Sequence, residues 1–371
     1  MGTPSPPAAA SQPQEASSNT ETQPQEASSG AGTHPRPVAA TPVEGTSAPA
    51  GLPLRRGHRG EAVRDLQQRL ALVGYSRDDD PLHFDAATEA ALRRFQADRG
   101  LVVDGICGPQ TWGALVEADH RLGDRLLYYK APMMRGDDVA DLQRRLGQLG
   151  FDPHWVDGIL GPRTQRAVRQ FQHNVGLPDD GVVGHSTVEA LDRLASRTSE
   201  EITIAQVREH ERLRSQSSSV EGKRIVVGDS GELPVITQAM ARRLRHAGAQ
   251  VLSFNSPDLS HQARTSNQWG ADIYLGITLV LENYGVAYFA MSGFESVGGR
   301  ALACRCSSAL GSVIDEPVPA VPMRLPILRA TRMPAVWCRI GPGPVVVPRA
   351  PQIAYALSEA VTDWCLDPGI L

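Results

Sequence analysis

Side chains that could do chemistry are few and scattered in this sequence. His246 and His261 stand in helix-like stretches, and neither has a second ligand at metal-binding spacing. The pair Cys304-x-Cys306 is tighter than the C-x₂₋₄-C pair of zinc sites. Ser230 is followed by a glycine, but no G-x-S-x-G elbow and no partner histidine accompany it. These residues predict neither a newly built zinc site nor a serine nucleophile.

One charge stands out at the end of an apolar run. Arg339 interrupts residues 333–340, a stretch that is otherwise typical of a strand buried on both faces. A guanidinium is costly to bury without a partner. We therefore expect Arg339 either to pair with an acid, Glu232 or Asp229, or to bind an anion.

The surrounding pattern predicts an α/β domain over residues 223–368. The strand-like stretches RIVVG, AQVLSF and ADIYLGITLV alternate with the helical stretches LPVITQAMARRLRHAG and LSHQARTSNQWG. This order of strand, helix, strand, helix and strand predicts a mainly parallel sheet flanked by helices. Arg339 would lie at the end of one of its strands.

A repeat precedes that domain. The stretch GEAVRDLQQRLALVGY corresponds to GDDVADLQRRLGQLGF, and the two align without a gap, so that Leu66 matches Leu142 (142 − 66 = 76). Apolar residues recur at helical i, i+3, i+7 spacing within each unit. We therefore expect two small three-helix domains, over residues 54–120 and 130–195.

These spacings resemble the peptidoglycan-binding-like domain found in bacterial cell-wall hydrolases. Its pattern of G-x-x-V-x-x-L-Q-x-x-L, then F-Q, then D-G-x-x-G-x-x-T, occurs in both units. The resemblance implies peptidoglycan or its precursors as partner, contacted by polar groups around Gln96, Asp104, Gln172 and Asp180. The alternative, which we favour, is that these four residues cap helices and satisfy turns.

The α/β domain resembles the zinc-dependent N-acetylmuramoyl-L-alanine amidases of the Amidase-3 type. PILRATRMPAVWCRIG matches that family's VLR-x-T-x-MP-A-V-L-V-E-x-G segment, and HQARTSNQWGADIYLGI matches its segment ending in S-I-H. The family binds zinc through two histidines and a glutamate, and a further glutamate is its general base. The resemblance places Glu232 at the ligand glutamate, Thr278 at one histidine and Arg339 at the general base. The loop GDSGE, where the other histidine belongs, holds none.

These substitutions imply that the catalytic site is not intact. Zinc hydrolases need three protein ligands and an open position for an activated water. Arginine cannot accept a proton and would repel the metal ion. We therefore expect no working catalytic residue and no cofactor, with zinc bound only if the chain is an active amidase.

The whole layout resembles an actinobacterial family of amidase-like proteins. That family is implicated in the cytoplasmic regulation of peptidoglycan precursor synthesis, through the enolpyruvyl transferase MurA and through Ser/Thr phosphorylation. The resemblance implies a non-catalytic regulator that binds a precursor or a biosynthetic enzyme such as MurA, with a Ser/Thr kinase as a further partner. The alternative is a zinc-dependent N-acetylmuramoyl-L-alanine amidase that hydrolyses peptidoglycan.

Composition limits the other possibilities. The net charge is −4, so nothing indicates a nucleic-acid partner. No apolar run approaches the roughly 18 residues of a transmembrane helix. The N-terminal stretch lacks the positive start and apolar core of a secretory peptide, which predicts a cytoplasmic protein. The five cysteines are odd in number and scattered, which favours reduced thiols.

Two segments are expected to lie outside the folded domains. Residues 1–52 are mostly Pro, Ala, Ser, Gln, Glu, Thr and Gly, and they cannot bury enough surface to offset chain entropy. We expect them to form a disordered tail. Residues 196–222 are highly charged and predict an exposed linker helix that fades into a flexible serine run.

The tail gives a first testable prediction. Limited proteolysis of the full chain should remove residues 1–52 quickly and leave a stable fragment that begins near Leu54, because cleavage concentrates in segments without buried backbone. N-terminal sequencing of the fragment checks this. Protection of the tail would mean that it docks on a folded domain.

Overall fold

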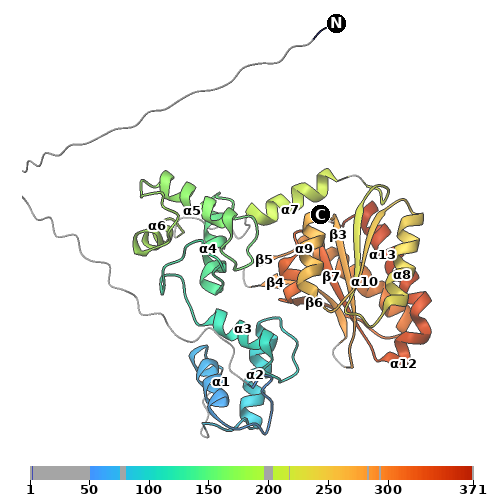
Figure 1. Ribbon diagram of the computed structural model, residues 1–371, viewed down its shortest axis with the longest axis horizontal. Helices are drawn as coiled ribbons and strands as arrows, with labels where there is room; N and C mark the ends of the chain where they lie inside the picture. The colour runs from blue at the N-terminus through green and yellow to red at the C-terminus, as the bar shows by residue number, and fades with distance from the viewer. Residues whose placement is uncertain are drawn as a thin grey trace, which may run out of the picture. The chain divides into compact units, whose positions relative to one another are not determined.

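The computed structural model describes residue 2 and residues 51–75, 81–195, 204–216, 218–281, 284–291 and 294–369. The described residues from 51 onward belong to one compact unit, Gly45–Leu371. The tail predicted to be disordered lies almost wholly outside the described residues. Figure 1 shows two groups of helices followed by a sheet that helices cover on both faces.

The first repeat domain (54–120) contains α1 (Glu61–Leu72), α2 (Ala86–Asp98) and α3 (Pro109–Ala118). The Asp85 carboxylate caps α2, since it accepts a hydrogen bond from Thr88 N at 2.8 Å. The apolar residues at helical spacing meet in one core, with Leu66, Leu70, Leu92, Phe95 and Leu115 at its centre. The predicted three-helix fold is confirmed.

The second repeat domain (130–195) contains α4 (Asp137–Gln148), α5 (Pro162–Asn174) and α6 (His185–Ala195). Its ring packing reproduces that of the first. Phe151 meets Phe171 edge-on with centroids 5.5 Å apart, as Tyr75 meets Phe95 at 5.4 Å. Both pairs lie at corresponding positions of the repeat, so the repeated sequence gives repeated packing.

The α/β domain supplies the rest of the described chain. Its strands form one sheet in the order β2-β1-β3-β7-β4-β5, and β6 also pairs with β4. The strands β2, β1, β3 and β7 are parallel neighbours, whereas β4 runs antiparallel to β7. The mainly parallel sheet is therefore confirmed. The strands are β1 (Arg224–Asp229), β2 (Gln250–Asn255), β3 (Ile273–Leu279), β4 (Gly285–Met291), β5 (Phe294–Glu295), β6 (Ala320–Met323) and β7 (Ala335–Ile340).

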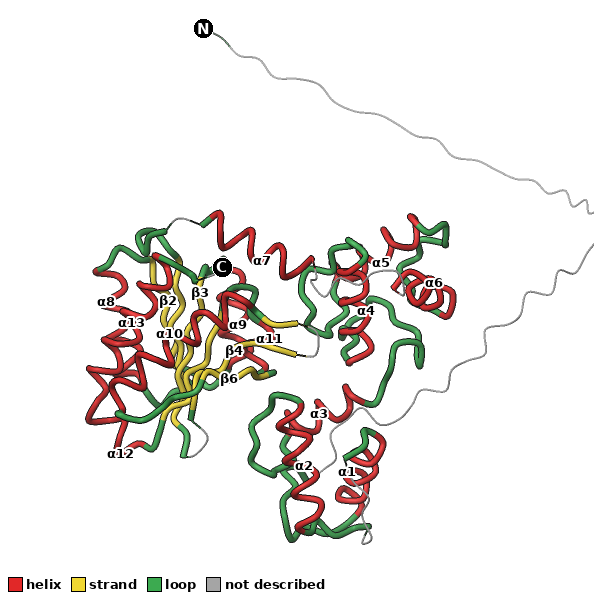
Figure 2. The backbone as a smooth tube through the Cα atoms, turned by 180° about the vertical axis from the view of Figure 1, so that it is seen from behind, coloured by secondary structure: helices red, strands yellow, loops and turns green. Residues whose placement is uncertain are grey.

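Helices cover both faces of this sheet (Figure 2). Apolar residues of α8, α10 and α13 pack on one face, and those of α9 and α11 pack on the other. The second core also takes in Ala140 and Val156 of the second repeat domain, so the repeat shares apolar contacts with the sheet domain. The helices are α8 (Pro234–His246), α9 (Leu259–Trp269), α10 (Val297–Ile314), α11 (Pro326–Ala330), α12 (Gly343–Val346), the 3₁₀ turn Val347–Arg349, and α13 (Ala350–Leu366).

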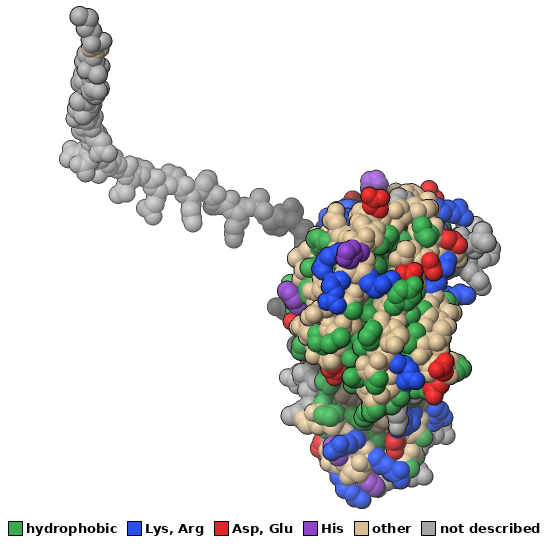
Figure 3. Space-filling model, turned by 90° about the vertical axis from the view of Figure 1, so that its right-hand side faces the viewer, with side chains coloured by type: hydrophobic (Ala, Val, Ile, Leu, Met, Phe, Trp, Pro, Cys, Tyr) green, Lys and Arg blue, Asp and Glu red, His purple; other side chains and the backbone are tan. Residues whose placement is uncertain are grey.

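The surface carries no single dominant charge on the face that Figure 3 presents, where acidic and basic side chains are interspersed. That distribution agrees with the small net charge of −4. None of the described helices combines the length and the apolar character that a membrane span requires.

The segment predicted as an exposed linker contains α7 (Ile204–Ser215), and one face of this helix is buried. Ala205, Glu209 and Leu213 are each no more than 5% exposed. Glu209 accepts hydrogen bonds from Ser296 Oγ at 2.7 Å and from the backbone N–H groups of Val297 and Gly298 at 3.1 and 3.2 Å. It therefore satisfies the free N–H groups at the start of α10 and fixes α7 to the α/β domain.

This contact gives a stability prediction. The change Glu209→Ala should lower the free energy of unfolding by about 1–3 kcal/mol, because it leaves buried N–H donors of α10 without an acceptor. Urea denaturation followed by circular dichroism measures the loss. Glu211→Ala, at an exposed position of the same helix, is the matched control and should leave the midpoint nearly unchanged. Equal effects of the two changes would contradict the capping role of Glu209.

Candidate functional site

The carboxyl ends of β1, β3 and β7 meet at one edge of the sheet. Asp229 at the end of β1 lies beside Ile277, and Thr278 of β3 lies beside Arg339 of β7. In parallel sheets, ligands bind outside this edge. The structure therefore brings together the residues that the amidase resemblance singles out.

Glu232 lies against the end of β3. Its Oε2 accepts hydrogen bonds from Ser230 Oγ at 3.2 Å, from Thr278 Oγ1 at 3.5 Å and from Leu279 N at 3.1 Å. The two hydroxyls, of Ser230 and Thr278, are also 2.9 Å apart. The cluster thus consists of one carboxylate and two hydroxyls, and the carboxylate already serves as acceptor for the loop and the strand end.

Asp229 is fully buried and plays a separate role. Its Oδ1 accepts from Gly231 N at 2.6 Å, and its Oδ2 accepts from Thr237 Oγ1 at 3.0 Å. Gly231 has φ +101°, a left-handed value that favours glycine. Asp229 therefore holds the turn after β1 against the first turns of α8, and both of its carboxylate oxygens are engaged.

Arg339 is 8% exposed. Among the described residues its side chain donates one hydrogen bond, from Nη1 to Met323 Sδ at 3.6 Å, and it makes no ion pair. Burial lowers the pKa of this guanidinium, and the charge of Asp104 in the first repeat domain opposes that shift. The expected pairing with Glu232 or Asp229 is therefore wrong. Both carboxylate oxygens of Asp229 are engaged by Gly231 N and Thr237 Oγ1, and Glu232 directs its Oε2 to Ser230, Thr278 and Leu279 N instead of to Arg339.

The residues at this edge do not fit the zinc ion that the resemblance implies. Zinc sites of hydrolases use three nitrogen, sulfur or carboxylate ligands. Here the Asp229 carboxylate is fully buried and engaged at both oxygens, which leaves Glu232 as the accessible carboxylate. Thr278 offers a hydroxyl, and Arg339 brings a positive charge to the neighbouring strand. Within the described ranges, no group of three or more His, Cys, Asp or Glu side chains could hold a metal ion.

Of the four polar residues predicted to contact glycan, Gln96 and Gln172 are buried, whereas Asp104 and Asp180 are exposed. Gln96 is fully buried, and its Nε2 donates to Asp104 Oδ1 at 2.8 Å while its Oε1 accepts from Gly105 N at 2.9 Å. Gln172 makes the same two bonds with Asp180 and with Gly181, each at 2.9 Å. These contacts support the alternative that the four residues shape turns.

A third copy of this arrangement escaped the sequence analysis. Gln143 Nε2 donates to Asp157 Oδ1 at 2.9 Å and to Thr164 Oγ1 at 3.1 Å, and its Oε1 accepts from Gly158 N at 2.8 Å. The signal was present, because DGILGPRT at 157–164 repeats DGICGPQT at 104–111. Each such turn holds its glycine at positive φ and links two helices.

Two arginines that the sequence analysis also missed join the repeats to the α/β domain. Arg329 Nη1 donates to both carboxylate oxygens of Glu117, at 2.8 and 2.9 Å, and its Nε donates to the Asp157 carbonyl at 2.6 Å. Arg324 pairs with Glu117 and with Asp137, each at 3.4 Å. Arg329 belongs to the segment PILRATRMP, so the segment that carries the amidase resemblance binds both repeats.

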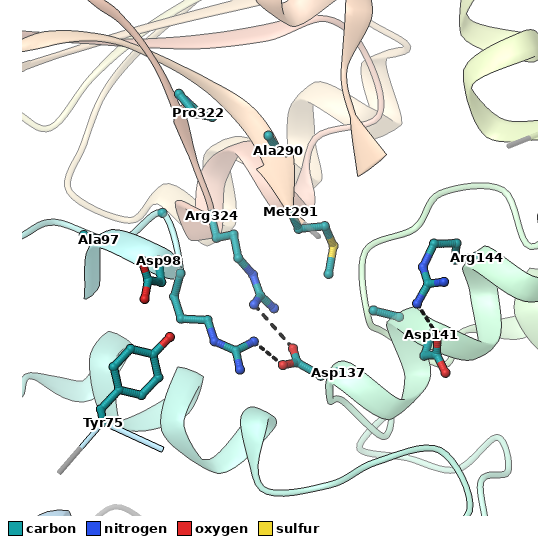
Figure 4. A pocket seen from close by; sticks show the side chains of 13 residues that line it. Tyr75, Ala97, Asp98, Asp137, Asp141, Arg144, Ala290, Met291, Pro322 and Arg324 are labelled. Atoms are coloured by element: carbon teal, nitrogen blue, oxygen red, sulfur yellow. Dashed lines mark hydrogen bonds and ion pairs between the residues drawn. The ribbon is translucent and has the colours of Figure 1, made fainter. Parts of the chain in front are cut away.

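A cavity of about 550 Å³ lies at this junction. Figure 4 shows Arg324 directed at Asp137, while Arg144 turns toward Asp141. Asp137 also accepts a hydrogen bond from Arg99 Nη1. These charged side chains of the wall are thus paired with one another, and Asp98, also in the wall, has a side-chain hydrogen bond with Tyr75. The cavity lies where side chains of the two repeats and of the α/β domain meet.

Comparisons with known proteins show what this chain is similar to. A family model described as "Putative peptidoglycan binding domain" matches residues 59–115 and 135–191. N-acetylmuramoyl-L-alanine amidase CwlM of Mycobacterium tuberculosis is 34% identical over 340 residues, covering 78% of this chain and 81% of the relative. N-acetylmuramoyl-L-alanine amidase CwlL of Bacillus licheniformis is 31% identical over 171 residues, covering 40% and 48% of the two chains. A solved N-acetylmuramoyl-L-alanine amidase from Clostridium difficile 630 is 17% identical, covers 39% of this chain and 97% of its own, and gives a TM-score of 0.33.

The environment of Arg339 gives a prediction about stability. The change Arg339→Met should leave the free energy of unfolding unchanged or raise it, because it removes a buried charge and leaves no buried carboxylate unpaired. The matched control is Arg329→Met, which removes the guanidinium that reaches both oxygens of the half-buried Glu117 and leaves it only Arg324, so it should cost about 1–3 kcal/mol. Urea denaturation of both variants measures the difference. If Arg339→Met lowered the free energy of unfolding as much as Arg329→Met does, Arg339 would have to have an ionic partner.

Proposed function

Because this chain belongs to the CwlM family, whose Mycobacterium tuberculosis member is named an N-acetylmuramoyl-L-alanine amidase, we propose that it is a non-catalytic protein of peptidoglycan metabolism. It binds a cell-wall precursor or a biosynthetic enzyme and thereby regulates cell-wall synthesis. The alternative is that it hydrolyses peptidoglycan as a zinc amidase. The names of its relatives favour the alternative, and the chemistry of its site favours the proposal.

The observation that carries the proposal is the place of Arg339. It stands at the end of β7, paired in register with Thr278, where the amidase resemblance puts a general base. A guanidinium stays protonated and has no lone pair with which to accept a proton from water. Its buried positive charge also disfavours a metal ion nearby. A hydrolytic step therefore lacks its base at this position.

The ligand positions support the same reading. The Glu232 carboxylate accepts from Ser230, from Thr278 and from Leu279 N. A hydroxyl at Thr278 is a poor substitute for an imidazole as a zinc ligand. Zinc would also require Glu232 to give up these hydrogen bonds. We infer that the cluster stabilises the edge of the sheet instead of activating a water.

Binding is the activity that the architecture supports. The repeat domains match a peptidoglycan-binding family model, and Glu117 and Arg329 attach them to the α/β domain through buried charge pairs. We infer that peptidoglycan or a precursor is one partner. On the ground of the sequence resemblance alone, we also propose a biosynthetic enzyme such as the enolpyruvyl transferase MurA and a Ser/Thr kinase.

The proposal predicts that catalysis is absent and cannot be restored by one change. The unmodified protein and Arg339→Glu should release no stem peptide from purified sacculi, because a general base needs an activated metal-bound water to deprotonate. Chromatography of the soluble products measures release, and an active zinc amidase run in parallel shows that the sacculi are cleavable. Elemental analysis of protein prepared without chelator should find no stoichiometric zinc.

Two results would favour the alternative. Release of stem peptide by the unmodified protein, lost on treatment with a chelator, would make the chain an amidase. One tightly bound zinc ion per chain would likewise contradict the proposed loss of the metal site.

A further inference from the structure

An arginine cluster surrounds His154 at a distance from the sheet edge described above. His154 lies in the loop between α4 and α5, and Arg163 lies in the first turn of α5. Arg208 comes from α7, and Arg332 comes from the loop before β7. Three separately folded parts of the chain thus each contribute a guanidinium to one place. We call these four residues the His154 cluster.

Two of the guanidiniums share one acceptor. His154 Nδ1 lies 3.0 Å from Arg163 Nη1 and 3.3 Å from Arg208 Nη1. Burial and then the charges of Arg163, Arg208 and Arg332 lower the pKa of His154 to about 4. The imidazole is therefore neutral near pH 7, and the lone pair of its Nδ1 can accept hydrogen bonds from the two guanidiniums. A neutral ring nitrogen offsets little of the repulsion between two cations.

The acidic residues nearby do not neutralise the positive charge of the His154 cluster. Asp152 pairs with Arg208 and also accepts from His154 N at 2.8 Å. The Glu209 carboxylate, on the adjoining turn of α7, is committed to the start of α10. Arg163 and Arg332 are exposed and form no ion pair with any residue that the structure describes. The cluster therefore holds an excess of positive charge.

The adjoining pocket is small, about 40 Å³, and its wall is mostly apolar, from Ala205, Leu213 and Pro334. The polar side chains of its wall are His154, Trp155, Arg208, Glu209, Arg212 and Arg332. The Trp155 indole N–H is shielded from solvent and has no hydrogen-bond partner among the described residues. A buried donor without a partner is costly.

We propose that the His154 cluster binds a phosphate group, either free phosphate or the phosphate of a small nucleotide. A phosphate presents several oxygens and up to two negative charges, which match convergent guanidiniums better than a single carboxylate does. Because the arginines come from the second repeat domain, from α7 and from the α/β domain, a bound phosphate ties these parts together. No residue of the sheet edge takes part, so this site is independent of the proposed function.

Calorimetric titration of the full chain tests the site. Inorganic phosphate should bind in the millimolar range or tighter, whereas acetate at the same ionic strength should not. Uridine diphosphate in a parallel titration distinguishes the two sources, since tighter binding than inorganic phosphate indicates a nucleotide ligand and weaker binding indicates the free ion. Imidazole NMR should show that saturating phosphate raises the pKa of His154, because the anion offsets the arginine charges.

Matched variants locate the site. Arg163→Gln and Arg332→Gln should each weaken phosphate binding at least about tenfold, as expected for loss of a charge-assisted hydrogen bond. Arg166→Gln removes the same charge from an exposed position of the same helix and should leave binding unchanged. Phosphate that binds no better than acetate would overturn the proposal. Equal weakening by all three variants would overturn it too, since binding would then reflect net charge alone.

Discussion

The architecture depends on one buried carboxylate, that of Glu117. It holds Arg329 through both oxygens and Arg324 through one, and the three side chains are no more than 14% exposed. Such pairs cost much to break, because a lost partner leaves a charge without water or counter-ion. The Arg329 guanidinium also reaches the Asp157 carbonyl. This group of charges therefore joins both repeats to the sheet domain, together with the apolar contacts of Ala140 and Val156.

Periodicity made most of the elements predictable. Leu66, Leu70 and Phe95 recur at helical spacing, and the structure buries all three in one three-helix core. The pairing of strands was not predictable in the same way. An apolar run such as that of β7 specifies a buried strand, but nothing in it specifies β3 as a parallel neighbour and β4 as an antiparallel one.

At the sheet edge, too, the positions of residues were predictable from the sequence, but their side-chain partners were not. The amidase resemblance predicted that Thr278 and Arg339 lie at one site, and the register of β3 with β7 places them side by side. The partner of Arg339 was predicted wrongly because a sequence shows which acids are near but not which are already engaged. In the structure Asp229 accepts from Gly231 N and Glu232 accepts from Leu279 N, and neither pairs with Arg339. For the same reason Glu209 looked like one charge among many on a surface helix.

The segment PILRATRMP has two roles, since it carries the resemblance to the amidases and also supplies Arg329. Arg329 within it binds Glu117 and the Asp157 carbonyl, so a substitution there disrupts assembly whether or not the neighbouring cleft does chemistry. In this chain, contacts between the domains are therefore enough to constrain Arg329, whatever chemistry the neighbouring sheet edge performs. The same segment thus serves the assembly of the molecule as well as the edge of the sheet.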